Sequence, residues 1–167
     1  MHKLHVMLIA AAALLLADGP AVKTGQTTVY KTGDDGTYQR GVARSYTRDL
    51  VSGTVMDHAT GLQWQDDAVG TSMNWEEACN YCAALVLDGK SDWYLPTRKE
   101  LVSITDKSRV DPAIDPAFVN VIFGHYWSST TDAVDTSRAW FVSFYDGHNS
   151  WFNRTGRCYV RCVRDGQ

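Results

Sequence analysis

The four cysteines of this chain are the residues with the widest chemical range, and they lie in two close pairs, Cys79 with Cys82 and Cys158 with Cys162. The spacings CxxC and CxxxC allow two disulfides in more than one pairing, a four-cysteine zinc site, or a redox-active CxxC. The N-terminal residues described below predict export. Because an oxidising compartment favours disulfides, we expect two bridges.

Catalytic chemistry has little support in the sequence. A serine or cysteine nucleophile needs a base within reach, and the histidines beyond the N-terminal leader, His58, His125 and His148, all lie in expected turns or loops. No GxSxG, HExxH, Walker or dinucleotide-binding motif occurs. The carboxylates of Asp66-Asp67 and Glu76-Glu77 are adjacent and therefore point apart. We expect a protein that is not an enzyme and has no catalytic residues.

Calcium is the one cofactor that the sequence leaves open, because carboxylate oxygens in loops are its usual ligands. The aspartates in expected loops are Asp34, Asp35, Asp132, Asp135 and Asp146. They do not have the spacing of a calcium-binding loop, and a tight turn explains Asp146-Gly147 without an ion. We expect no bound cofactor, with calcium as the alternative.

The C-terminal part combines positive charge with aromatic side chains. Residues 138–164 hold five arginines and one acidic residue, in a chain whose net charge is −3. Arginine among tryptophan and tyrosine is typical of surfaces that bind anions, sugars or proteins, whereas arginines that only solvate a sheet are the alternative. The negative overall charge argues against nucleic acid. The predicted ligand-binding residues are Arg138, Trp140, His148, Asn149, Trp151, Asn153, Arg154, Arg157 and Tyr159.

The first residues have the pattern of a signal peptide. Lys3 precedes an unbroken apolar stretch, Val6 to Ala17, which is too short to span a bilayer comfortably. Gly19 and Ala21 are the small residues expected before a cleavage site after Ala21. We predict a signal peptide at residues 1–21, export to the periplasm, cell surface or medium, and no membrane-spanning segment in the mature chain.

Periodicity predicts the elements that position these groups in one α+β domain, at residues 51–167. A polar, turn-rich lead-in at 22–50 precedes a hairpin at 53–65. A helix beginning at Trp75 places Cys79 and Cys82 on one apolar face, and a second helix begins after Pro96, each with the spacing of a capping box.

The C-terminal elements are predicted to be strands. Residues 139–145 and 148–152 form a hairpin around Asp146-Gly147, after a loop at 107–125. In a closing strand, Cys158, Val160 and Cys162 point to one side, and Tyr159, Arg161 and Val163 point to the other.

Five strings in order along the chain carry a family resemblance. They are TVMDHATGLQW at 54–64, WEEACNYC at 75–82, SDWYLPTRKEL at 91–101, YWSST at 126–130 and YVRCVR at 159–164. Together they resemble the bacterial DUF1566 domain, also called the Lcl C-terminal domain. The resemblance implies a C-type lectin-like fold, in the branch that includes formylglycine-generating enzymes, with two helices packed on a twisted, mostly antiparallel sheet and the chain ends close together.

The resemblance also bears on the cysteines. A cysteine at the end of the first helix usually accompanies one in the closing strand of this family, and the matching residues here are Cys82 and Cys162. The resemblance therefore implies that these two pair. Cys79 and Cys158 depart from the family pattern, and we expect them to form a second, parallel bridge.

The resemblance carries no activity across by itself. The calcium-dependent sugar motifs of lectins and the copper-binding cysteines of formylglycine-generating enzymes are both absent. The expected function is recognition of an extracellular or surface glycan or protein. The alternatives are a metal- or cysteine-dependent enzyme of the formylglycine-generating type and a structural envelope protein without a dedicated ligand.

Some members of this family and fold look like the variable proteins of diversity-generating retroelements, in which a C-terminal stretch is rewritten at template adenines to vary a binding face. Residues 148–159 occupy the matching place. Apart from Trp151, every residue there can be reached by mutating adenines of an AAC codon. If the stretch is diversified, Cys158 is itself a variable position.

Overall fold

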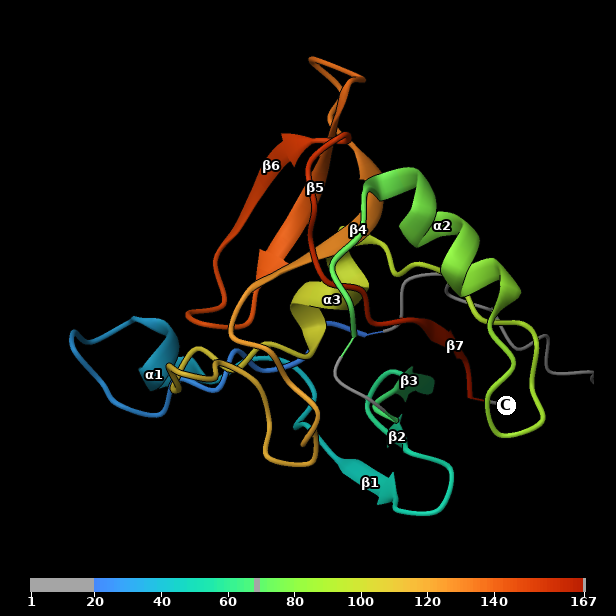
Figure 1. The fold of residues 1–167 in the computed structure, drawn as a ribbon. Coiled ribbons are helices and arrows are strands. Elements are labelled where there is room, and N and C mark those ends of the chain that lie inside the picture. Colours follow the sequence, from blue (N-terminus) through green and yellow to red (C-terminus); the bar gives the residue numbers. More distant parts are fainter. Residues whose placement is uncertain (1–19, 68–69, 167) are drawn as a thin grey trace, which may run out of the picture.

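The computed structural model describes residues 20–67 and 70–166, so the predicted apolar stretch of the signal peptide lies outside the described residues. The chain forms an α+β domain with two antiparallel sheets (Figure 1). The first sheet has the strand order β1-β2-β3-β7, and the second has the order β4-β5-β6. The strands are β1 (Tyr46–Asp49), β2 (Thr54–Asp57), β3 (Leu62–Gln65), β4 (His125–Thr131), β5 (Arg138–Ser143), β6 (Asn149–Asn153) and β7 (Val163–Asp165).

Three helices complete the described part of the chain: α1 (Asp35–Tyr38), α2 (Trp75–Ala84) and α3 (Arg98–Ser103). Both predicted capping boxes are present, with Asn74 and Thr97 as the N-cap residues. In each, the cap side chain accepts a backbone N–H while a glutamate in the first turn accepts the N–H of the cap. These caps fix where α2 and α3 begin, as the sequence predicted.

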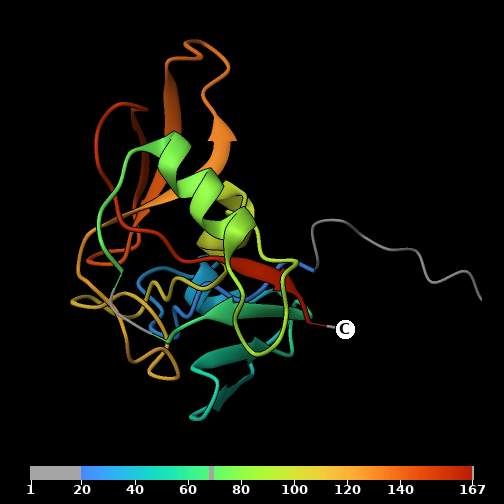
Figure 2. The ribbon, with the colours of Figure 1, turned by 45° about the vertical axis from the view of Figure 1, so that its right-hand side comes forward.

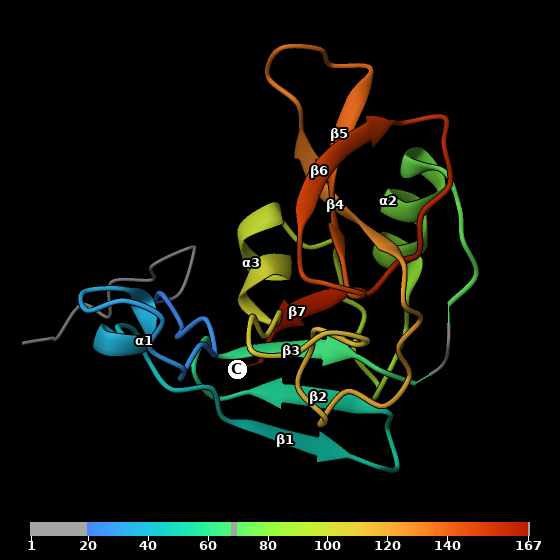
Figure 3. The same ribbon diagram turned by 90° about the vertical axis from the view of Figure 1, so that its left-hand side faces the viewer.

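The two sheets correct the expectation of a single twisted sheet. Figure 3 shows the four-stranded sheet below the three-stranded one, with α3 beside them. The first sheet also includes β1, which the sequence assigned to a loosely ordered lead-in. β1 pairs with β2 along its whole length, but Tyr46 is its one apolar residue, so no apolar alternation marked it as a strand.

Residues 158–163, called the closing chain, run between two apolar clusters. Cys158, Val160 and Cys162 pack in one cluster with α2, whereas Tyr159 and Val163 pack in the other with α3. The predicted alternation of side chains is therefore present, although only the last part of this segment is a regular strand. Figure 2 shows α2 and the chain that enters β7 side by side.

The disulfide joins α2 to this closing chain. Cys82 and Cys162 are bonded, with their α-carbons 5.5 Å apart, as the family resemblance implied. The prediction of a second bridge is wrong, since Cys79 and Cys158 are free thiols. The physical reason is a mismatch of rise: three helical residues advance about 4.5 Å, whereas four extended residues advance about 13 Å, so two parallel bridges cannot both close.

Among the residues that the structure describes, no helix combines the length and apolarity needed to cross a membrane.

Candidate ligand-binding face

The hairpin of β5 and β6 carries two tryptophans directly opposite each other. In its antiparallel register Trp140 faces Trp151, and Arg138 faces Asn153. Because side chains alternate between the two faces of a sheet, these residues and Asn149 project from the same side. These five residues are called the tryptophan face below. All five were predicted as ligand-binding residues, and the structure brings them together.

Two guanidinium groups lie over the indole rings of this face. The guanidinium of Arg98, from α3, lies 4.2 Å from the ring centre of Trp140, and that of Arg138 lies 3.8 Å from the ring centre of Trp151. Both distances are within the range of a cation–π interaction. The side chain of Trp151 is nevertheless 46% exposed, so part of its ring is open to a ligand.

The two arginines differ in their other partners. Arg138 forms ion pairs with Asp132 at 2.9 Å and Asp135 at 3.3 Å, and these contacts hold its guanidinium in place. Within residues 20–67 and 70–166, the guanidinium of Arg98 has no hydrogen bond or ion pair besides its stacking on Trp140. Arg98 therefore keeps its N–H donors for a ligand. Sequence reasoning missed it, because no local signal connects the first turn of α3 to a strand far along the chain.

The other four predicted residues lie elsewhere. His148 points to the opposite face of the sheet, where it contacts Phe141 edge to face. Arg157 lies 3.6 Å from Glu77 at the start of α2, and Tyr159 packs against the core. The nine residues therefore do not lie on one surface, because side chains alternate between the two faces along β6 and the chain bends after it.

Arg154 borders an open groove of about 500 Å³ at the end of the hairpin. Its guanidinium lies 3.7 Å from the ring centre of Trp75, a residue that was not predicted for the site. The groove is lined by Asn74, Glu76, Ser137, Asn153, Arg154 and Thr155. Asn153 belongs both to the groove and to the tryptophan face, so the two surfaces are continuous at this residue.

A comparison of the sequence with models of known families identifies the family of this chain. The model of the family described as Lcl C-terminal domain matches residues 53–164. The chain belongs to this family. No curated protein matches it. The matched residues of the Lcl domain include α2, α3 and the whole tryptophan face, and they leave out the lead-in before the first hairpin.

The opposite face of the three-stranded sheet carries a histidine pair. The ring of His125 stacks on Phe141 with 4.1 Å between ring centres, and it meets His148 edge to face at 5.8 Å. Burial, together with the nearby His148, lowers the pKa of His125. Burial alone would raise the pKa of Asp146, but hydrogen bonds from His148 and Ser143 lower it to about 2.

Two of the arginines counted in the positive C-terminal segment are buried. Arg161 binds Asp66 at 2.6 Å and is 3% exposed, whereas Arg164 binds Asp92 at 2.7 Å and is 6% exposed. Neither is available to a ligand. The charge count therefore overstated the positive charge of the surface, because the partners of these arginines lie far away in the sequence.

The aspartates considered for calcium are bonded to protein groups. Asp34 caps α1, Asp132 and Asp135 bind Arg138, and Asp146 binds His148. Within the described ranges, no group of three or more histidine, cysteine, aspartate or glutamate residues is arranged to hold a metal ion. These carboxylates have structural roles in caps, turns and ion pairs.

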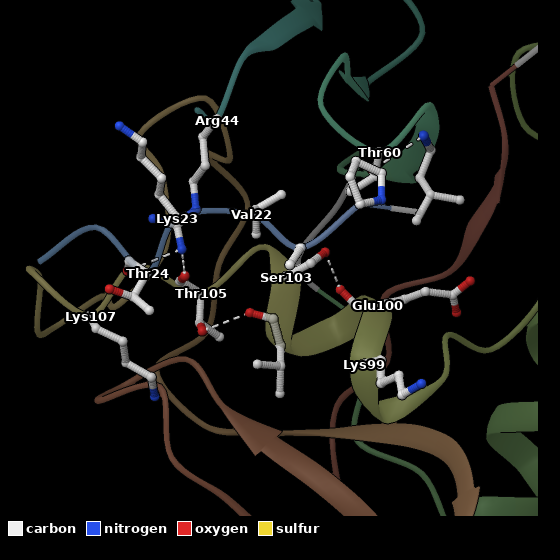
Figure 4. Close-up of a pocket in the computed structure, with 14 residues that line it drawn as sticks. Val22, Lys23, Thr24, Arg44, Thr60, Lys99, Glu100, Ser103, Thr105 and Lys107 are labelled. Carbon is white, nitrogen blue, oxygen red and sulfur yellow. Dashed lines mark hydrogen bonds between the residues drawn. The ribbon is translucent and has the colours of Figure 1, made fainter. Parts of the chain in front are cut away.

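A second cavity, of about 420 Å³, lies between the lead-in and α3 (Figure 4). Arg44 donates to the carbonyl oxygens of Thr24 and Thr105 and so ties the lead-in to the Lcl domain. Lys99 and Lys107 lie at opposite ends of the cavity in Figure 4, so they do not converge on one anion. The cavity shares no residue with the tryptophan face.

Proposed function

We propose that this Lcl domain is an exported recognition module, built on a C-type lectin-like scaffold, that binds a glycan or protein through its tryptophan face. The observation that carries the proposal is the aligned pair of Trp140 and Trp151 on one face of the hairpin, with arginines stacked on both rings and Trp151 46% exposed. Aromatic and arginine side chains contribute most of the energy at binding surfaces. The disulfide is compatible with an oxidising compartment outside the cytoplasm.

The state of the free thiols supports a non-catalytic role. Burial raises the pKa of Cys158 to about 12 and also raises the pKa of Cys79. A thiol acts as a nucleophile or metal ligand only after it loses its proton. We therefore favour recognition over a cysteine-dependent reaction of the formylglycine-generating type.

Diversification of the C-terminal stretch is part of the proposal. Residues 148–157 are exposed or half-buried, and most of them lie on β6 or in the turn after it, so substitutions there would alter the surface and spare the core. Cys158 is buried, and its backbone pairs with that of Met73. Because substitutions at Cys158 would disturb the core, we expect the variable stretch to end at Arg157. A reverse transcriptase gene beside a near-copy of these codons in the neighbouring DNA is the expected finding.

The direct test is binding of a glycan library by the native protein and three variants. Trp151→Ala should weaken binding about tenfold, because it removes the exposed stacking surface. Arg98→Ala should weaken binding of a sulfated glycan but leave its desulfated form unchanged. Tyr145→Ala removes an aromatic side chain of similar exposure in the hairpin turn and is the matched control. Equal affinities for Trp151→Ala and Tyr145→Ala would contradict the proposed face.

A further inference from the structure

β6 is a sheet edge that nothing in the described structure covers. In Figure 1 it is the outermost strand of its sheet, and no element lies beyond it. The other edges are protected: β1 carries Arg48 and Asp49, β4 is paired with the closing chain at Tyr159, and β7 is paired at Tyr94. β6 reads NSWFN, without a charge or a proline. Natural edges usually carry such features because an unprotected edge pairs with another strand.

The backbone of β6 offers hydrogen-bonding groups to such a strand. Ser143 donates its N–H to His148, and Arg154 donates its N–H to Ser137. Hydrogen-bonded pairs alternate along an antiparallel ladder, so the N–H and C=O groups of Asn149 and Trp151 point away from β5. Within the described ranges these outward groups have no partner in the chain.

We propose that two copies of this chain pair through β6, antiparallel, about a two-fold axis at Trp151. In this register Trp151 faces the same residue of the second copy, and Asn149 faces Asn153. An outward-pointing residue at the axis forms the hydrogen-bonded type of pair, as the backbone of Trp151 requires. The two three-stranded sheets then join into one continuous sheet, and the open edge disappears.

The side chains fit this register. Trp140 lies opposite Trp151 within one copy, so the joined sheet carries four tryptophans in one row across its face. On the other face, Phe152, which is 44% exposed, lies opposite Ser150 of the second copy. The two Arg138 side chains stand three strand spacings apart across the sheet and four residues apart along it. Their separation of about 20 Å exceeds the screening length at physiological salt.

The pairing also extends the binding face, and this step rests on the proposed function. One copy presents a single tryptophan pair, whereas the joined face presents a straight row of about 14 Å with Arg98 beside each end. The second copy therefore contributes its Trp151 to the binding site of the first.

A cysteine placed on the axis tests the pairing. Trp151→Cys, in a Cys79→Ser background, puts two thiols opposite each other at about 5.5 Å between α-carbons, which is the usual spacing of a disulfide. Mild oxidation should convert this variant to a covalent dimer. Asn149→Cys is the matched control, because it lies on the same strand and face but about 14 Å along the strand from its own copy. It should stay monomeric, and adding Asn153→Cys to it should restore crosslinking.

Sedimentation equilibrium of the native protein provides the second measurement. We expect a dimer at tens of micromolar protein. A monomer at about 100 µM, or equal crosslinking of Trp151→Cys and Asn149→Cys, overturns the pairing. Glycan binding is measured separately on the same samples: a monomer that binds glycans overturns the dimer and leaves the proposed function intact, whereas a dimer that binds none overturns the function alone.

Discussion

Replacing Asp66 by asparagine should destabilise the fold more than any other single loss of charge among the ion pairs described. The side chain of Asp66 is fully buried and lies between Arg48 and Arg161. It also accepts the backbone N–H groups of Val119 and Asn120. This one carboxylate therefore joins β1, the closing chain and the loop before β4.

The magnitude follows from what the substitution leaves behind. Asparagine has nearly the same shape as aspartate, so the packing around residue 66 is unchanged. The guanidinium of Arg161, however, becomes a cation at 3% exposure without a counter-ion. Removing one partner of a buried pair costs about 3–5 kcal/mol. For a domain of about 150 residues this corresponds to a fall in Tm of roughly 6–20 °C.

Urea unfolding followed by tryptophan fluorescence measures this difference directly. Asp92→Asn is the matched control, because Asp92 also binds an arginine but its side chain is 58% exposed, and solvent screens the charge of an exposed carboxylate. Adding Arg161→Met to Asp66→Asn should recover part of the lost stability, since it removes the orphaned charge. Equal destabilisation by Asp66→Asn and Asp92→Asn would refute the assignment of Asp66 as a buried ion-pair centre.

Three further predictions concern the cysteines and the histidine pair. Replacing both disulfide cysteines by alanine should cost about 4 kcal/mol in urea unfolding, because the bridge closes a loop with a sequence separation of 80. Thiol titration should find two thiols after unfolding and slow, partial reaction at Cys79 in the native state, whereas four blocked thiols would contradict the structure. His125 should titrate below an ordinary histidine by NMR, and His148→Ala should raise its pKa. Because folding lowers the pKa of His125, the stability it contributes is present above the ordinary histidine pKa and is lost as pH falls through the folded value.

Local signals predicted most elements of the fold. The capping boxes at Asn74 and Thr97 fixed the starts of α2 and α3, and the turn at Asp146-Gly147 placed the hairpin that carries the tryptophans. The division into two sheets was not predictable in this way, because it depends on which distant strands pair.

The candidate site was predicted only in part, because some of its residues are related by local spacing and others by tertiary contacts. Alternation along β5 and β6 is a local property, so the residues of the tryptophan face could be identified from their spacing. Arg98 and Trp75 join the surface through tertiary contacts with Trp140 and Arg154, which no spacing reveals. Arg161 looked like a surface cation because its partner, Asp66, lies 95 residues away.

These contacts change the expected basis of binding from charge to stacking. Arg138 is neutralised by Asp132 and Asp135. Arg98, which stacks on the tryptophan face at Trp140, has no counter-ion among the described residues. Binding through charge falls steeply with salt, whereas stacking on Trp151 does not. Affinity for a glycan should therefore change by no more than the contribution of one exposed charge between low and physiological salt, as measured by calorimetry with Arg98→Ala for comparison. A steep salt dependence that persists in Arg98→Ala would show that other arginines bind the ligand.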